Sequence, residues 1–422
     1  MSASDPVSEQ LASVLEWLAS EPADDPHAEL NALRGRLGRL PEAAAGGAPL
    51  VQCVDEFEAR VLDVCGRLKP RLLNAALPLS HELHAVAGEL VEALLEVAGK
   101  LGEMAAATRE RWRPVRRGDP MAVTARALGL VHEAFVVAAM GGAVTPPGLW
   151  LAAYGIVEAG GGFDALVSAR PETAAADALH ALKRLLALAV LQPESLTARE
   201  LVWANDYLEG VADEGALSRE TLMPAASSFW IDSGEDLPPI ATIRSAPPVA
   251  EGLVHFSAFG VSRALTGQLD WLKERIAEAE AVGLERDGEL LEPDASGLPV
   301  GLTPVEMVSL LRRMRDRWAL PPNRGQSRRA YRYSVQVCVG LRAVWEAARS
   351  DGATERISEW MVYNESPGGY ALMSVEGVTG SLSAGMAVAL RRDAGHPWSV
   401  CIVRWIRSDS PGQVELGLQL VA

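Results

Sequence analysis

Residues 328–341 read RRAYRYSVQVCVGL, an arginine-rich segment followed by an alternating one. From Tyr333 onward, apolar residues alternate with Ser, Gln, Cys and Gly up to Leu341. A period of two is the pattern of a β-strand with one buried face. The stretch therefore predicts a strand that begins directly after a cluster of arginines.

Further strand patterns follow toward the C-terminus. Residues 387–390 form a short apolar run after Gly385, residues 400–406 place apolar side chains on one face, and residues 414–420 alternate again. Short strands separated by Gly, Pro and Asp are typical of a small antiparallel barrel or sandwich. We expect a β-barrel of about six strands over residues 321–422, with residues 345–356 as a loop or one helical turn.

Two polar motifs accompany these strands. Arg328 and Arg332 are spaced as RxxxR, and residues 364–369 read NESPGG, which fits NxSxxG. A guanidinium presents coplanar donors that match a phosphate or the O6/N7 edge of guanine. Neither motif is specific alone, because Arg313 and Arg317 repeat the RxxxR spacing in a helix with an expected solvated basic face, and NxSxxG is an ordinary turn signal. The two motifs together, in this order and beside predicted strands, are a more specific signal than either motif alone.

In order, spacing and flanking strands, these motifs resemble the PilZ family, whose members bind cyclic di-GMP. The resemblance covers the last quarter of the chain and implies an antiparallel barrel with the ligand at its mouth. It implies that Arg328 and Arg332 clamp the phosphates and the guanine edge. Arg329 would add a phosphate contact if its side chain swings toward the ligand.

The second motif would supply the neutral part of the site. The resemblance implies that Asn364 and Ser366 offer donors and acceptors to the base or phosphate, and that Gly369 lets the backbone turn close to the ligand. Pro367 stiffens this loop. The alternative is that all of these residues form a solvated barrel rim that binds nothing.

Charge separates the barrel region from the rest. Residues 321–422 contain eleven Arg, no Lys and nine acidic residues, whereas the whole chain has a net charge of −16. A nucleic-acid polymer would be repelled by the acidic body, so a small anion suits the basic module better. We therefore exclude nucleic-acid polymers as partners.

The N-terminal half has helical periodicity. Apolar residues recur every three or four positions over residues 83–101, and similar patterns cover 122–140, 149–157, 175–191 and 196–208. Helices joined by Gly and Pro turns stack as neighbours. Residues 1–220 are thus expected to form a helical bundle or a helical-repeat body, and the sequence leaves both open.

Residues 221–320 form a predicted linking region. A short β insertion is expected within residues 225–257, followed by helices at 264–281 and 304–318. Pro321 and Pro322 prevent helix continuation and lead the chain to Arg328. The expected fold class is therefore multidomain α and β, a helical body followed by a small antiparallel barrel.

Catalytic and metal sites are not evident. His81 and His84 are three residues apart but lack the HExxH spacing of zinc proteases, and Gly160-Gly161-Gly162 has no preceding strand or following lysine. The four cysteines have no CxxC spacing and are expected to be reduced and buried. We expect no enzyme, no metal and no cofactor.

The N-terminus lacks the features of a signal peptide, and the apolar residues 128–144 are too short and too polar for a membrane span. The protein is expected to be cytoplasmic, without membrane insertion. Three functions stay open: a cyclic di-GMP receptor that passes nucleotide occupancy to an effector protein through its helical region, a helical scaffold with a degenerate barrel, and an enzyme regulated by the barrel. We favour the first, and a homodimer is an open alternative.

Overall fold

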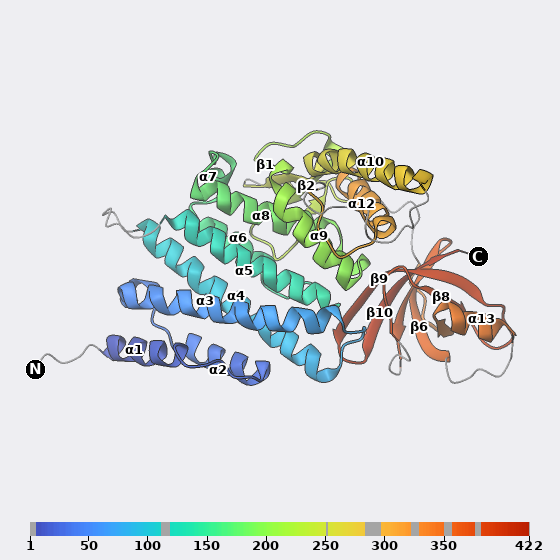
Figure 1. Ribbon diagram of the computed structural model, residues 1–422, viewed down its shortest axis with the longest axis horizontal. Coiled ribbons are helices and arrows are strands. Elements are labelled where there is room, and N and C mark those ends of the chain that lie inside the picture. The colour runs from blue at the N-terminus through green and yellow to red at the C-terminus, as the bar shows by residue number, and fades with distance from the viewer. Residues whose placement is uncertain are drawn as a thin grey trace, which may run out of the picture.

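The computed structural model describes residues 6–110, 119–249, 252–282, 297–321, 329–349, 357–375 and 381–421. A helical body with a small sheet leads to a β-barrel at one end of that body (Figure 1). Buried apolar side chains between residues 11 and 318 form one core, and those between 335 and 418 form a second. The expected fold class is confirmed, while the division into 1–220, 221–320 and 321–422 stays a prediction.

The helices of the body pack side by side in layers (Figure 1). The α-helices range from 5 residues in α7 to 30 residues in α4, and α3 is kinked at Gly47, so the described helices share no repeat length and form an irregular bundle. Their bounds are α1 (Pro6–Leu18), α2 (Pro26–Leu37), α3 (Ala43–Leu73), α4 (His81–Glu110), α5 (Pro120–Met140), α6 (Leu149–Gly160), α7 (Phe163–Val167), α8 (Ala174–Val190), η1 (Pro193–Ser195), α9 (Ala198–Val211) and η2 (Ala212–Glu214).

Capping residues fix several helix starts. Before α9, the Thr197 hydroxyl accepts a hydrogen bond from Glu200 N (3.2 Å), and the Glu200 carboxylate accepts one from Thr197 N (2.9 Å). This capping box satisfies amides that have no partner within the helix. Asp236 caps α6 from a distant loop by accepting from Gly148 N and Trp150 N. That contact ties the loop to the body.

Helix α5 explains the most apolar stretch of the sequence. At 21 residues it is long and apolar enough to cross a membrane, longer than the segment expected from sequence. Yet 67% of its most apolar window is buried, against α4, α6 and α8. A buried core helix has this composition, so packing accounts for it without a membrane.

Buried His132 on α5 makes a pH-dependent contribution to stability. It is 3% exposed, and its Nε2 lies 2.5 Å from Asn205 Oδ1 on α9. Burial lowers the pKa of His132 to about 4, against about 6.5 in an unfolded chain. Below about pH 6.5 the His132 imidazole is protonated in the unfolded chain, whereas in the folded chain it stays neutral down to about pH 4. Stability is therefore lost as the pH falls through this window.

We expect this group to remove up to about 3 kcal/mol from the free energy of unfolding between pH 7 and pH 4. Urea denaturation at a series of pH values measures it. His132→Gln should flatten this part of the profile, whereas His396→Gln, which replaces an exposed imidazole, should leave it unchanged. Equal slopes for wild type and His132→Gln would contradict the assignment.

A four-stranded antiparallel sheet, in the order β1-β4-β2-β3, and two helices complete the body. They lie in the region where the sequence predicts a short β insertion followed by helices. The Trp318 side chain is fully buried, stacks on Tyr207 and donates to Ala187 O (3.0 Å). The bounds are β1 (Ala216–Ser218), η3 (Ala225–Ser227), β2 (Ser228–Ile231), β3 (Ile240–Ala241), β4 (Val254–Ser257), α10 (Phe259–Val282) and α12 (Pro304–Ala319).

The basic face of α12 differs from the sequence expectation. Arg313 pairs with Glu200, and Arg317 donates to Leu191 O and to Ser195 Oγ. Both arginines are half-buried against η1 and α9. The expected solvated face is wrong here, because the periodicity of one helix does not reveal which neighbour covers its polar side.

The C-terminal strands form a closed antiparallel barrel in the order β10-β7-β6-β5-β8-β9. Helix α13 (Leu341–Arg349) occupies nine residues, more than the expected loop or single turn. The strands are β5 (Tyr333–Val339), β6 (Ile357–Ser366), β7 (Gly369–Ser374), β8 (Ala387–Arg391), β9 (Ser399–Ser410) and β10 (Gln413–Leu420).

Backbone hydrogen bonds attach the barrel to the body. Ser408 N, on β9, donates to Gly142 O (2.7 Å), and Leu382 N donates to Leu77 O (3.0 Å). Asp409 accepts a hydrogen bond from Val144 N (3.0 Å). Strand β9 thus meets the loop between α5 and α6, and the loop between α3 and α4 meets the segment before β8.

Candidate functional site at the barrel rim

The segment before β5 runs beside the end of β6. Arg329 and Glu365 form an antiparallel bridge, with Arg329 N to Glu365 O at 2.9 Å and Glu365 N to Arg329 O at 3.0 Å. The next pair is Tyr333 with Val362. Between these two pairs there are three residues on the arginine side (330–332) and two on β6, so residues 330–332 form a bulge. This bulge exposes Arg332 at the rim.

Tyr333 links three segments of this rim. Its hydroxyl donates to Glu365 Oε2 (2.8 Å), and the guanidinium carbon of Arg392, just after β8, lies 4.9 Å from the centre of its ring. Burial, and then the hydrogen bond to Glu365, raises the pKa of Tyr333. The hydroxyl therefore stays protonated and holds Glu365 in place.

Asn364 and Ser366 flank Glu365 on β6. Within the described part of the chain, Asn364 Oδ1 is buried and has no hydrogen-bond partner. An unsatisfied buried acceptor costs about 1–3 kcal/mol, so a donor supplied by a ligand would relieve this cost. Ser366 Oγ donates to Gly369 O (3.3 Å) across the two-residue turn of Pro367 and Gly368.

Gly369 is required by the packing of the barrel. It is buried at the start of β7 and pairs with Gln419 of β10. A Cβ atom there would lie 2.0 Å from Leu418 O. The close approach of two strands therefore demands glycine, whereas the sequence had suggested a turn beside a ligand.

Arg391, Arg392 and Trp398 lie at the same end of the barrel and were not predicted as site residues from the sequence. Arg391 Nε donates to Gln336 Oε1 (2.9 Å), and its guanidinium carbon lies 4.4 Å from the centre of the Trp398 ring. Arg392 is exposed over Tyr333. The available signal was an Arg-Arg pair directly after an apolar strand. Stacking on an indole leaves the terminal N–H groups of a guanidinium available to an anion, provided that no other group already accepts hydrogen bonds from them.

The rim has an excess of positive charge. Among the described residues of this rim, the side chains of Arg329, Arg332, Arg391 and Arg392 outnumber the carboxylates of Glu365 and Asp393. A hydrogen bond from His396 and then one from Gly395 N lower the pKa of Asp393, so it stays ionised. The structure places five of the predicted site residues at this rim, and Arg328 lies outside the described residues. The five are Arg329, Arg332, Asn364, Ser366 and Gly369.

Two family models match the chain. Residues 344–422 match the model of the middle PilZ domain of the cyclic-di-GMP receptor FimW. The C-terminal barrel is a PilZ domain. Residues 12–221 match the model of the N-terminal domain of the same receptor, so the body and the PilZ barrel both resemble parts of one binding protein. The PilZ match begins after Arg332, which leaves the first arginine motif outside it.

One relative supports the same family. The cyclic-di-GMP receptor FimW of Pseudomonas aeruginosa is 39% identical over 61 residues, which are 14% of this chain and 10% of FimW. The chain thus matches about a tenth of the length of that relative. No solved structure matches the chain. Within the described residues, no group of three or more His, Cys, Asp or Glu side chains could hold a metal ion.

Proposed function

We propose that this protein is a receptor that binds cyclic di-GMP at the rim of its PilZ barrel. The observation that carries the proposal is the bulge at residues 330–332, which exposes Arg332 beside the bridge between Arg329 and Glu365. The family models support the same ligand, because both describe domains of a cyclic-di-GMP receptor.

Each residue has a distinct role in this proposal. Arg329 and Arg332 donate to phosphate oxygens or to the guanine edge, with Arg328 as a further clamp. The unpaired Asn364 oxygen accepts from a guanine amino or ring N–H group, and Ser366 offers its hydroxyl. Gly369 keeps the β6–β7 turn close to β10 and thereby holds these side chains at the rim.

Calorimetric titration of cyclic di-GMP into the full chain tests the function. We expect saturable binding with a Kd in the micromolar range or tighter, about −8 kcal/mol. Cyclic di-AMP should bind much more weakly, because adenine lacks the O6 acceptor that the arginines recognise. An absence of heat in a chain shown to be folded would contradict the proposal.

We also propose that occupancy passes from the barrel to an effector protein bound by the helical body. Strand β7 adjoins β10, and β10 adjoins β9, which contacts Gly142 and Val144 of the body. Amide exchange at residues 142–144 should change when cyclic di-GMP binds, and unchanged exchange would contradict the transmission. A cytoplasmic location accords with the burial of α5, and a homodimer remains an alternative.

A helical interaction scaffold with an inactive barrel is the second candidate. One observation favours it: the PilZ model matches from residue 344, so Arg328 and Arg332 lie before the matched region. The titration above separates the two candidates, since the scaffold predicts a folded barrel that binds no nucleotide.

A further inference from the structure

Tyr331 is an exposed aromatic side chain between two arginines of the rim. It is 42% exposed and lies in the bulge of residues 330–332, two residues after Arg329 and next to Arg332. A single exposed aromatic residue is common on protein surfaces. Two features distinguish this one, namely the support of its ring and the charges on either side of it.

The ring of Tyr331 packs against Tyr333. The two rings meet edge to face, with their centres 6.4 Å apart and their planes at 65°. Tyr333 is itself fixed, because its hydroxyl donates to Glu365 Oε2 (2.8 Å) and the guanidinium carbon of Arg392 lies 4.9 Å from its ring centre. An edge-to-face contact covers at most one face of a ring. Tyr331 therefore combines a fixed neighbour with an exposed aromatic surface.

The arginines around this ring have no ion-pair partner. Arg329, Arg332 and Arg392 are exposed, and none of them pairs with a carboxylate within the described residues. Such guanidinium groups donate to phosphate oxygens or to the edge of a guanine base. Hydrogen bonds of this kind leave the face of the base uncovered, and the neighbouring Tyr331 ring can cover it.

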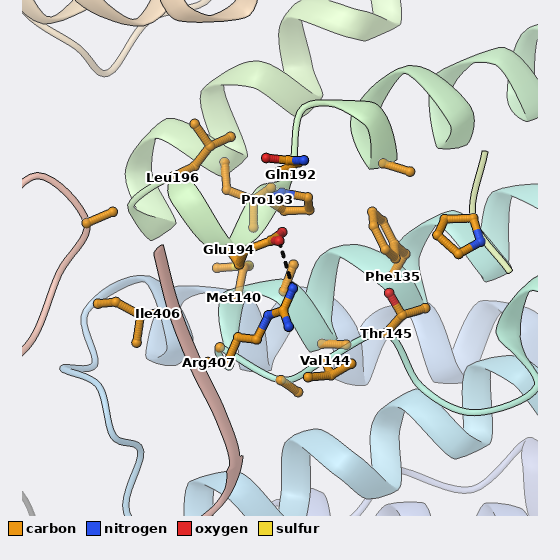
Figure 2. A pocket seen from close by; sticks show the side chains of 18 of the residues that line it. Phe135, Met140, Val144, Thr145, Gln192, Pro193, Glu194, Leu196, Ile406 and Arg407 are labelled. Carbon is orange, nitrogen blue, oxygen red and sulfur yellow. Dashed lines mark hydrogen bonds and ion pairs between the residues drawn. The ribbon is translucent and has the colours of Figure 1, made fainter. Parts of the chain in front are cut away.

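The cavity between body and barrel differs from the rim in this respect. It has a volume of about 520 Å³, and Figure 2 shows Arg407 paired with Glu194 at its edge. Each arginine that lines it already has a partner: Arg407 pairs with Glu194 (3.1 Å), Arg199 pairs with Glu306 (3.9 Å), and Arg244 donates to the side-chain oxygen of Gln192 (2.8 Å). Guanidinium groups that are already engaged are less available to an anion. We therefore place the nucleotide, and the base that it carries, at the rim.

We propose that Tyr331 is a base-stacking residue of the rim site, with its ring against the face of a purine base. This inference rests on the proposed function, because the base is that of cyclic di-GMP. Arg329 and Arg332 hold the phosphates or the guanine edge, and the Tyr331 ring supplies the contact to the face of the same base. A stacking contact of this kind depends on the aromatic ring and not on the hydroxyl group.

Calorimetric titration of cyclic di-GMP into full-length variants tests the stacking. Tyr331→Leu keeps an apolar side chain but removes the ring, so it should weaken binding at least about fivefold, the lower end of the loss for one base–aromatic stack. Tyr331→Phe keeps the ring and should bind as the wild type does. Both variants should melt at the wild-type temperature, because the replaced side chain is exposed.

An NMR signal of the ligand reports the stack directly. The guanine H8 resonance should move upfield when cyclic di-GMP binds the wild type or Tyr331→Phe, because an aromatic ring shields protons that lie over its face. The upfield shift should be smaller with Tyr331→Leu. A purely structural role of Tyr331 would not produce this difference.

Trp345→Leu is the matched control. Trp345 is the other exposed aromatic side chain of the described residues, and it lies on α13, at the other end of β5 from the bulge. Its replacement should leave nucleotide affinity unchanged. Wild-type affinity in folded Tyr331→Leu, or equal losses in Tyr331→Leu and Tyr331→Phe, would overturn the stacking and leave the nucleotide site standing. A wild-type chain that binds no cyclic di-GMP would overturn the proposed function together with the stacking.

Discussion

Replacement of both Arg329 and Arg332 with alanine is expected to weaken cyclic di-GMP binding by at least about a hundredfold. In the proposed site, each guanidinium makes a charge-assisted hydrogen bond to the ligand, worth about 1.5–3 kcal/mol. Arg329 lies at the bridge to Glu365, and Arg332 lies in the bulge that follows it. Their effects need not add, because neighbouring contacts to one ligand are coupled. Calorimetry with the single and double variants measures both the loss and the coupling.

Arg342→Ala is the matched control for this experiment. Arg342 is an exposed arginine on α13, at the other end of β5 from Arg332, and its Nε donates to Glu346 Oε1 (3.0 Å) along the helix. Its replacement removes the same charge from the same barrel and should leave nucleotide affinity within about twofold of wild type. Equal losses in Arg342→Ala and Arg332→Ala would mean that net charge, and not the rim, governs binding.

Gly369→Ala is expected to destabilise the barrel by roughly 3 kcal/mol or more. The added Cβ would lie 2.0 Å from the carbonyl oxygen of Leu418, which belongs to the backbone of β10 and cannot rotate away. The pairing of β7 with β10 must therefore shift, and the β6–β7 turn must shift with it. Thermal unfolding followed by far-UV circular dichroism measures this loss.

Gly395→Ala controls for the general cost of replacing a glycine in the barrel. Gly395 is exposed, and the new carbon would meet only the flexible Asp393 side chain, at 3.3 Å. Its unfolding temperature should stay close to that of wild type. If Gly369→Ala unfolds at the same temperature as Gly395→Ala, the close approach of β7 and β10 does not constrain this position.

Local sequence patterns were sufficient for most of the secondary structure. The alternation after Tyr333 predicts β5, and the apolar spacing around residues 83–101 predicts α4. The start of α13 was missed because the alternating strand pattern was extended through Leu341, although Leu341, Val344 and Trp345 follow the spacing of a helix face.

Long-range geometry was not predictable in the same way. The bulge at residues 330–332 depends on the register between β5 and β6, which no local pattern specifies. The need for glycine at position 369 arises from β10, about fifty residues further along the chain.

Hydrogen–deuterium exchange of the full chain with and without cyclic di-GMP tests the central claim most directly. The account predicts that the nucleotide slows amide exchange in two peptides, one covering residues 329–333 and one covering residues 362–370, and that Arg332→Ala abolishes both effects. Protection confined to the helical body, or protection of the rim that persists in Arg332→Ala, would contradict a nucleotide site at the rim of the PilZ barrel.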